Sequence, residues 1–436
     1  MKTSVKTPAF RQRLYFLLLL LLVAGGFTLR LNWFLQKDGR EIVRIAEEGY
    51  YLSTAVNAFV GKGFEPEGNF EPDAAVFVPP PAQSFVLLTW FRVCGRVTSM
   101  FGFKLLQIFI SALGIFLAAD IGKKIAGRWG GLAFAGLFAF YPDFVFWPAY
   151  VATESNYLIG LLGFLWLLLK WLEKPGTISA AALAVMLGGL HLMRPNGFFL
   201  GPLLAVFLVQ TFSWKKARVW AVIWITVPYL VLVPWMLHNV QKHDDAVWVS
   251  SNGGILFYFV NRLEYNPLRE PYYEQVAFGP HADRLYDPGV DAKNSRGETT
   301  YHRMSKHYFA KSFAYMGHHP LHFMKNVFIR TWNQFVLPQE ITRVALPGVF
   351  ASAYFFLLVH RLLLATGLFG VAVALLTKPN LKTRALLWIF GYYTVFAALF
   401  HLTGDGRMNL FLKLFLAIFS AMACRFILRN NAHEST

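Results

Sequence analysis

The sequence predicts an all-α polytopic membrane protein with about ten transmembrane helices, amphipathic juxtamembrane helices and a long extracytoplasmic loop. Three observations support this fold class. Of the 436 residues, 56% are hydrophobic and only 15% are charged, whereas about a quarter of the residues of a soluble domain are charged. Apolar runs long enough to cross a bilayer recur along the chain. Basic residues stand in short clusters between these runs.

The formal net charge of +17 could indicate a nucleic-acid-binding protein. The basic clusters instead follow the positive-inside pattern of membrane proteins, which accounts for the charge without a nucleic-acid partner. The chain has only two cysteines, Cys94 and Cys424, and the predicted topology puts them near opposite membrane faces. We therefore expect neither a disulfide nor a cysteine metal site.

A spanning helix needs about 20 mostly apolar residues, and fewer where flanking side chains reach the interface. The first such stretch has a basic start, but no clear cleavage site follows it, so we expect a retained helix rather than a signal peptide. The predicted spans are 14–35, 103–123, 130–149, 156–173, 177–193, 196–213, 218–238, 349–376, 383–402 and 408–428.

With the basic N-terminus in the cytoplasm, every short basic loop falls on the cytoplasmic side, and so does the C-terminus. This agreement requires residues 81–95 not to span. We expect them to form an amphipathic helix on the outer membrane surface, entered through Pro79-Pro80-Pro81.

The chain then divides into three parts. Residues 1–238 form an N-terminal transmembrane core with a first extracytoplasmic loop at 36–102, and residues 239–348 form a second extracytoplasmic loop. Residues 349–436 form the C-terminal transmembrane helices. We expect a multi-pass protein of the plasma (inner) membrane, with its functional site on the extracytoplasmic side.

Adjacent carboxylates, Glu47 and Glu48, follow the first span beside Tyr50 and Tyr51. They could be solvated charges at the start of a surface helix, which is predicted at 43–60 and ends at glycines. They could also be the chemical centre of an active site. Consecutive helical side chains diverge by about 100°, so the two carboxylates would have different roles.

Further charged candidates stand at outer ends of spans. Glu154 could be a dipole-favoured residue after a Thr153 cap, or a functional acid, because an acid at a membrane boundary is costly. Arg407 could be an interfacial arginine or an anion clamp, since guanidinium binds phosphate oxygens in a fork. Arg262 and Arg194 are weaker candidates of the same kind.

Other site classes have little support. The histidines lack acidic partners at helical spacing, and no HExxH motif occurs, so no metal site is predicted from them. The two glutamates could hold a divalent cation, although nothing specifies one. No GxGxxG or P-loop pattern indicates a nucleotide site.

These residues resemble the GT-C glycosyltransferases, in particular a bacterial branch related to protein O-mannosyltransferases and lipid A aminoarabinose transferases. The Glu47-Glu48 pair and Tyr51 match an acidic pair with a following tyrosine in that family. Further matches are the proline-led helix PPPAQSFVLLTWFRVCG, Glu154, Arg194-Pro195, Pro234-Trp235 and the closing stretch 404–407.

The chain departs from the family pattern at several of these positions. Glu47 replaces the usual aspartate, and Val78 stands where a basic residue often precedes the prolines. His238 replaces an arginine after the Pro-Trp, and the usual proline is missing after Arg407. Val78 cannot supply the phosphate contact that the family pattern implies for a basic residue at its position.

The resemblance implies a glycosyltransferase that uses a polyprenyl-phosphate sugar, a membrane lipid donor, and inverts the anomeric carbon. The acceptor would be an extracytoplasmic glycan, lipid or protein. Glu47 would act as the base, with Glu48 or Glu154 orienting the acceptor and Tyr51 and Arg194 binding substrate. Arg407, with Arg262 or His238, would hold the donor phosphate. The alternatives are a transporter or lipid flippase, for which we expect internal repeats and charges inside the spans, and a purely structural membrane protein.

Overall fold

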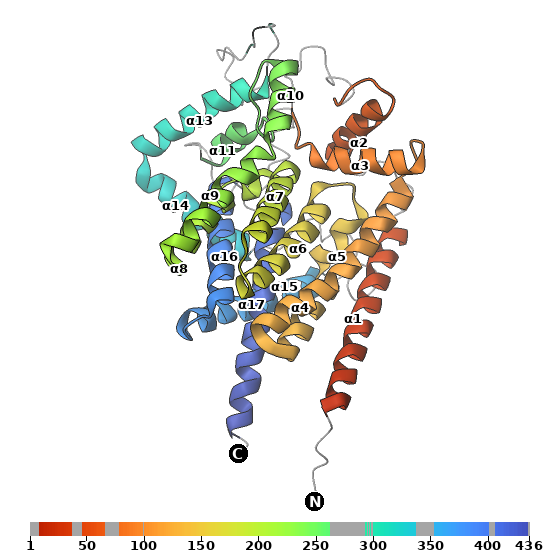
Figure 1. The fold of residues 1–436 in the computed structure, drawn as a ribbon, viewed down its shortest axis with the longest axis vertical. Helices are drawn as coiled ribbons and strands as arrows, with labels where there is room; N and C mark the ends of the chain where they lie inside the picture. The colour runs from red at the N-terminus through yellow and green to blue at the C-terminus, as the bar shows by residue number, and fades with distance from the viewer. Residues whose placement is uncertain are drawn as a thin grey trace, which may run out of the picture.

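The computed structural model describes residues 8–36, 46–65, 78–98, 100–261, 293, 295, 297, 300–336, 353–400 and 406–434. Within these ranges, the side chains of 8, 46–48, 259, 301, 336, 353–356, 406–409 and 429–434 lie outside the description. In these residues helices dominate, as predicted, and they stand side by side in a bundle (Figure 1). The N-terminal start of the first helix and the C-terminal end of the last lie at the same end of the bundle.

Most predicted spans coincide with a helix. These helices are α1 (Pro8–Gln36), α4 (Met100–Phe140), α6 (Thr153–Glu173), α7 (Thr177–Met193), α8 (Leu200–Thr211), α9 (Trp214–Leu230), α15 (Ala353–Leu376), α16 (Leu381–Phe400) and α17 (Gly406–Glu434). Within the described residues, 7 helices are long and apolar enough to cross a membrane, and two shorter apolar helices accompany them. The count of about ten spans stays a prediction.

The second and third predicted spans are the two arms of α4, which fold back on each other at Gly127. Its φ of 75° is a left-handed conformation that glycine adopts without strain. The second arm ends at Phe140, earlier than predicted, because Pro142 follows and cannot continue the helix. Residues 142–149 instead form the short helix α5 (Pro142–Phe146) and a 3-10 turn, η1 (Trp147–Ala149).

Arg30 fastens α1 to both arms of this hairpin. Its guanidinium is fully buried and donates to Ser111 Oγ at 3.0 Å in the first arm, and to the carbonyls of Phe138 at 2.8 Å and Ala139 at 2.9 Å in the second. These carbonyls belong to the last turn of α4, where no further helical amide can reach them. The buried arginine therefore caps the end of the hairpin.

The hairpin can close because Gly122 has no side chain. A methyl group there would lie 2.6 Å from the carbonyl oxygen of Gly130 in the other arm. We expect Gly122→Ala to lower the free energy of unfolding by about 1–3 kcal/mol, the usual cost of overpacking. Unfolding titrations in mixed detergent micelles measure the effect.

Gly136 provides the matched control for this prediction. A methyl group at Gly136 would meet only Leu22, at 3.9 Å. Gly136→Ala should therefore be neutral or stabilising by up to about 1 kcal/mol through helix propensity. Equal effects of the two substitutions would show that the close approach of the arms does not limit stability.

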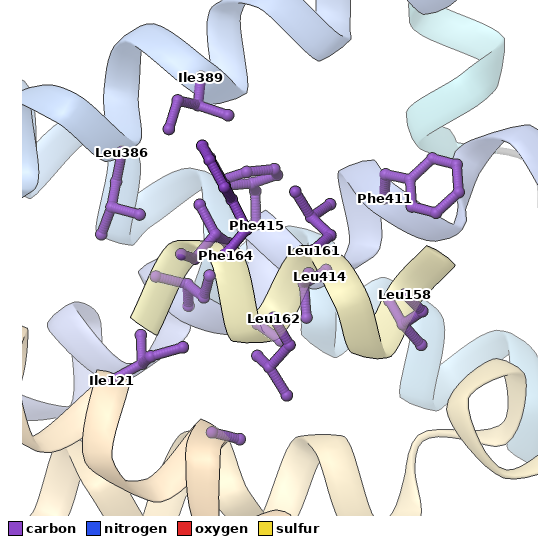
Figure 2. Packing of buried hydrophobic residues seen from close by; sticks show 14 of the residues in the cluster. Ile121, Leu158, Leu161, Leu162, Phe164, Leu386, Ile389, Phe411, Leu414 and Phe415 are labelled. Atoms are coloured by element: carbon purple, nitrogen blue, oxygen red, sulfur yellow. The ribbon is translucent and has the colours of Figure 1, made fainter. Parts of the chain in front are cut away.

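The core of the bundle includes a cluster of apolar side chains between α6, α16 and α17. Figure 2 shows Leu158, Leu161 and Phe164 of α6 facing Leu386 and Ile389 of α16 and Phe411, Leu414 and Phe415 of α17, and all are buried or nearly so. Residues 410–421 of α17 are buried around the whole helix. A helix that is apolar on all sides is a central helix, which the others surround.

The basic loops gather at the end of the bundle where the termini lie. Glu173, at the end of α6, pairs with Lys124 of the α4 hairpin at 2.8 Å and with Lys382 at the start of α16 at 2.6 Å. Arg425 of α17 also donates to the carbonyl of Ile125. The clustering expected from the positive-inside pattern is thus present for these loops, while the side on which they face stays a prediction.

The opposite end carries the predicted extracytoplasmic segments. Helix α2 (Ala46–Phe59) ends before Gly61 and Gly63, both with positive φ, and α3 (Ala82–Cys94) runs across the bundle rather than through it (Figure 1). Helices α10 (Val233–His243), α11 (Gly253–Asn261) and α13 (Tyr301–His318) lie at this end too, and α14 (Pro320–Val336) follows α13. The helix predicted at 81–95 is confirmed, and the helix predicted at 43–60 is present over 46–59, while 43–45 lie outside the described residues.

Helix α14 is amphipathic, and the two faces have different contacts. Its buried Arg330 donates to the carbonyls of Ala398 and Val260 and, at 2.8 Å, to Asn261 Oδ1, which joins α14 to α11 and α16. Its other face exposes Phe328 and Trp332. Such a face is typical of a helix in the membrane interface.

Candidate active site

The candidate site is built around a buried ion pair between Glu154 and Arg194. Arg194 Nη1 lies 2.6 Å from Glu154 Oε1 and donates a hydrogen bond to Thr153 Oγ1 at 2.8 Å. Glu154 has no exposed surface and Arg194 is 7% exposed. Removing either partner of a pair this deeply buried strongly destabilises the folded protein, because the other charge is left uncompensated. Each residue therefore holds the other in place.

Local sequence explains why these two side chains meet. Glu154 is in the first turn of α6, where the helix dipole favours an acid. Arg194 has an extended backbone at the end of α7, as expected for a residue that precedes a proline. Because α6 and α7 are consecutive antiparallel helices, the start of one lies beside the end of the other.

The first turns of α17 bring Arg407 to the same place. The ring of Phe411 lies 5.9 Å from the guanidinium carbon of Arg194 and 4.7 Å from the ring of Tyr157, one turn after Glu154. Arg407 precedes Phe411 by four residues, or about 6 Å along the helix axis. The structure therefore places the backbone of Arg407 close to the Glu154–Arg194 pair, although its side chain lies outside the described residues.

Helix α2 approaches through Tyr51. Tyr51 is 6% exposed and belongs to a small buried cluster with Phe91 of α3, Phe103 of α4 and Val151, which precedes Glu154 by three residues. Glu47 and Glu48 are in the first turn of α2, one turn before Tyr51. Their side chains lie outside the described residues, so the helix that carries them is placed but their carboxylates are not.

His238 lies farther along the same end of the molecule. Its ring stacks on Trp235 at 5.2 Å, and Trp235 donates to the carbonyl of Val249 at 3.1 Å. Trp235 and Val78 share a cluster against which Leu192 packs, two residues before Arg194. No contact joins His238 to the ion pair within the described residues. Arg262 lies outside them.

A second buried ion pair was not predicted from the sequence. Lys413 Nζ lies 2.5 Å from Asp143 Oδ2, and the two side chains are 2% and 0% exposed. Lys413 is on α17, two residues after Phe411, so the helix that carries Phe411 at the candidate site also carries the lysine of this pair. The sequence contains an indication of this pair, because both residues lie inside predicted spans. A charge is costly there and is expected to have a partner.

A buried lysine on α4 was missed as well. Lys104 follows Phe103, which packs in the Tyr51 cluster, and it has no exposed surface. Its charge inside a predicted span was the available signal.

The described residues contain no group of three or more His, Cys, Asp or Glu side chains that could hold a metal ion. Burial, followed by the positive charge of Lys306, lowers the pKa of the His302 imidazole, so this ring is neutral at pH 7. A neutral ring could ligate a metal, but among the described residues it has no further ligands of the kind that a site requires. The carboxylates of Glu47 and Glu48, which were the other candidate cation ligands, lie outside the described residues.

The fold and this end of the bundle define a polytopic α-helical membrane protein with two buried ion pairs beneath its polar segments. Solved structures of one class share the fold. The chain is similar to the oligosaccharyltransferase AglB from Archaeoglobus fulgidus, in complex with an inhibitory peptide and a dolichol-phosphate, with a TM-score of 0.54, 14% sequence identity, and coverage of 98% of this chain and 52% of that chain. For the apo form of the Archaeoglobus fulgidus oligosaccharyltransferase, the TM-score is 0.55 with 14% identity over 95% and 51% of the two chains.

A further similar structure is that of ArnT from Cupriavidus metallidurans bound to undecaprenyl phosphate, with a TM-score of 0.41, 16% identity, and coverage of 93% and 77%. No protein-family model and no curated protein matches the chain. The chain spans about half the length of the AglB structures that it matches. The likeness to AglB establishes the fold, and the GT-C fold implied by the sequence resemblance is confirmed.

Proposed function

We propose that this chain is a membrane glycosyltransferase that moves a sugar from a polyprenyl phosphate to an extracytoplasmic glycan, lipid or protein, with inversion at the anomeric carbon. The observation that supports this proposal most directly is that three features meet at one end of a GT-C fold. They are the Glu154–Arg194 pair, the first turn of α17 and the Tyr51 cluster. AglB, which shares this fold, was solved with a dolichol-phosphate.

In the proposed reaction, the acceptor oxygen attacks the anomeric carbon of the donor sugar. The bond between that carbon and the phosphate oxygen breaks, and its electron pair leaves with the polyprenyl phosphate. Glu47 takes the proton of the acceptor hydroxyl as general base. Arg407, with Arg262 or His238, balances the negative charge on the departing phosphate. Glu48 orients the acceptor, and Tyr51 contributes to substrate binding.

Glu154 and Arg194 form the support of this site. The carboxylate of Glu154 is occupied by Arg194 at 2.6 Å, so we propose that it orients substrate through Arg194 rather than by direct contact. The same guanidinium lies 5.9 Å from the ring of Phe411, one turn after Arg407 on α17. The pair thereby fixes the position of the proposed phosphate clamp relative to α6.

The experiment is a donor-consumption assay. Purified protein in liposomes is given radiolabelled polyprenyl-phosphate sugars and cell-envelope extract as acceptor source, and released polyprenyl phosphate is quantified by chromatography. We expect Arg407→Gln to lower release about 10²–10³-fold, the usual loss when one donor to a developing anion is removed. Arg429→Gln, at the opposite end of α17, should leave release unchanged.

Two results would contradict the proposal. One is release from nucleotide sugars but not from lipid-phosphate sugars. The other is movement of labelled lipid between leaflets without any release, which would favour the flippase alternative. The buried charges Asp143 and Lys413 are of the kind expected in a transporter, so leaflet exchange is measured in the same liposomes.

A further inference from the structure

A groove lies on the lateral surface of the bundle between α8, the end of α15 and α16. Its volume is about 530 Å³, and almost all of its wall is apolar. Its open side exposes Leu375 and Val395, which are 63% and 59% exposed. The lining residues are Leu203, Leu375, Arg384, Leu387, Trp388, Gly391, Tyr392 and Val395.

The groove runs along α16 for about the depth of one leaflet. From Arg384 to Val395 the helix rises about 16 Å. This is close to half of the hydrocarbon thickness of a bilayer, which is about 30 Å. Because Arg384 is in the first turn of α16, after the basic residues Lys378 and Lys382, we place this end of the groove at the level of the lipid headgroups and the Val395 end deeper in the membrane.

Arg384 marks the headgroup end. Lys382, two residues earlier, is paired with Glu173 at 2.6 Å, and Glu173 also pairs with Lys124. Within the described part of the chain, no carboxylate pairs with Arg384. Arg384 lines the groove, and a guanidinium group can donate in a fork to a phosphate group.

The middle of the groove is open because of Gly391. A methyl group built on Gly391 would meet no atom within 4 Å, although the residue is flanked on α16 by the large side chains Trp388 and Tyr392. An apolar chain can therefore lie over Gly391, along Leu387 and toward Val395. A single cation at one end and apolar walls elsewhere fit an amphiphile with an anionic head.

We propose that this groove binds one anionic phospholipid, with the phosphate at Arg384 and an acyl chain along Leu387, Gly391 and Val395. The site is separate from the proposed donor site. Arg384 is in the first turn of α16, whereas Arg407 follows the other end of that helix. By the predicted topology the lipid belongs to the cytoplasmic leaflet, where basic loops also favour anionic lipids.

The test is native mass spectrometry of the purified chain titrated with phosphatidylglycerol or phosphatidylcholine. We expect one phosphatidylglycerol to be retained in preference to phosphatidylcholine. Arg384→Gln should lower this preference about tenfold, as expected for the loss of a hydrogen bond between charged groups. Gly391→Leu should abolish retention of both lipids, because the new side chain fills the groove without meeting the core.

Gly189→Leu is the matched control. Gly189 is an exposed glycine of α7, outside the groove, with no atom within 4 Å of its Cβ position, and the variant should retain lipid as the wild type does. Unchanged retention in Gly391→Leu, or an unchanged preference in Arg384→Gln, would overturn the proposal. A third result would also overturn it: polyprenyl phosphate displaces phosphatidylglycerol from the wild type and does not bind to Gly391→Leu. The groove would then hold the chain of the proposed donor.

Discussion

Glu47→Gln is expected to abolish sugar transfer while the protein still folds and inserts into the membrane. The substitution keeps the shape of the side chain but removes the group that would accept the proton of the acceptor hydroxyl. Loss of a general base typically costs about 10²–10⁴-fold in rate. The measurement is product formation from a polyprenyl-phosphate sugar, with circular dichroism and size-exclusion profiles to verify folding.

The neighbouring acid should behave differently. Because consecutive side chains on a helix diverge by about 100°, the two acids cannot have the same role, and Glu48→Gln is expected to weaken transfer less than Glu47→Gln does. Glu173→Gln serves as control, since Glu173 is at the opposite end of the bundle, where it pairs with Lys124 and Lys382. Wild-type transfer by Glu47→Gln would end the assignment of Glu47 as base without contradicting the fold.

Lys413→Met is expected to lower the free energy of unfolding by about 3–5 kcal/mol, the usual cost of removing one partner of a buried ion pair. The Asp143 carboxylate has no exposed surface, and its Oδ1 has no hydrogen-bond partner within the described residues. Without the ammonium group of Lys413 the charge would be buried and uncompensated. Asp143→Leu alone should be destabilising for the reciprocal reason.

The double variant separates this cause from a packing defect. Replacing both partners by apolar residues, Asp143→Leu with Lys413→Met, should recover most of the lost stability, because neither charge is left buried. A double-mutant cycle from unfolding titrations in mixed detergent micelles gives the coupling energy. If the double variant is as unstable as the sum of the single variants, the ion pair is not the cause of their instability.

The sequence was sufficient to predict the class of fold and the order of most helices. Long apolar runs with basic clusters between them can form few structures in a membrane. A helix is the expected one, since backbone groups in lipid must be hydrogen-bonded within their own segment. The main difference is at 130–149, where the predicted span ends at Phe140 and is followed by α5 and η1. Pro142 indicates that the helix ends before it, but the span was predicted from the apolar character of the whole run.

The candidate site was predicted in part. Glu154 and Arg194 were both selected as boundary charges, and the structure joins them in one ion pair. Their pairing could not be predicted from spacing, because Arg194 stands 41 positions after Thr153, the neighbour of Glu154. The roles of Glu47, Glu48, Arg407, Arg262 and His238 stay predictions, and the chemistry assigned to them awaits the transfer assays.

By itself the sequence determined that this protein is a bundle of membrane helices whose polar segments collect toward one end. Long apolar runs and basic loops carry that information, because each depends on how its own segment meets lipid or water. Only the tertiary structure decided which charges meet. Lys413 and Asp143 are separated by 270 positions, and the pairing of buried charges depends on which helices pack side by side, a choice made by close packing in the core.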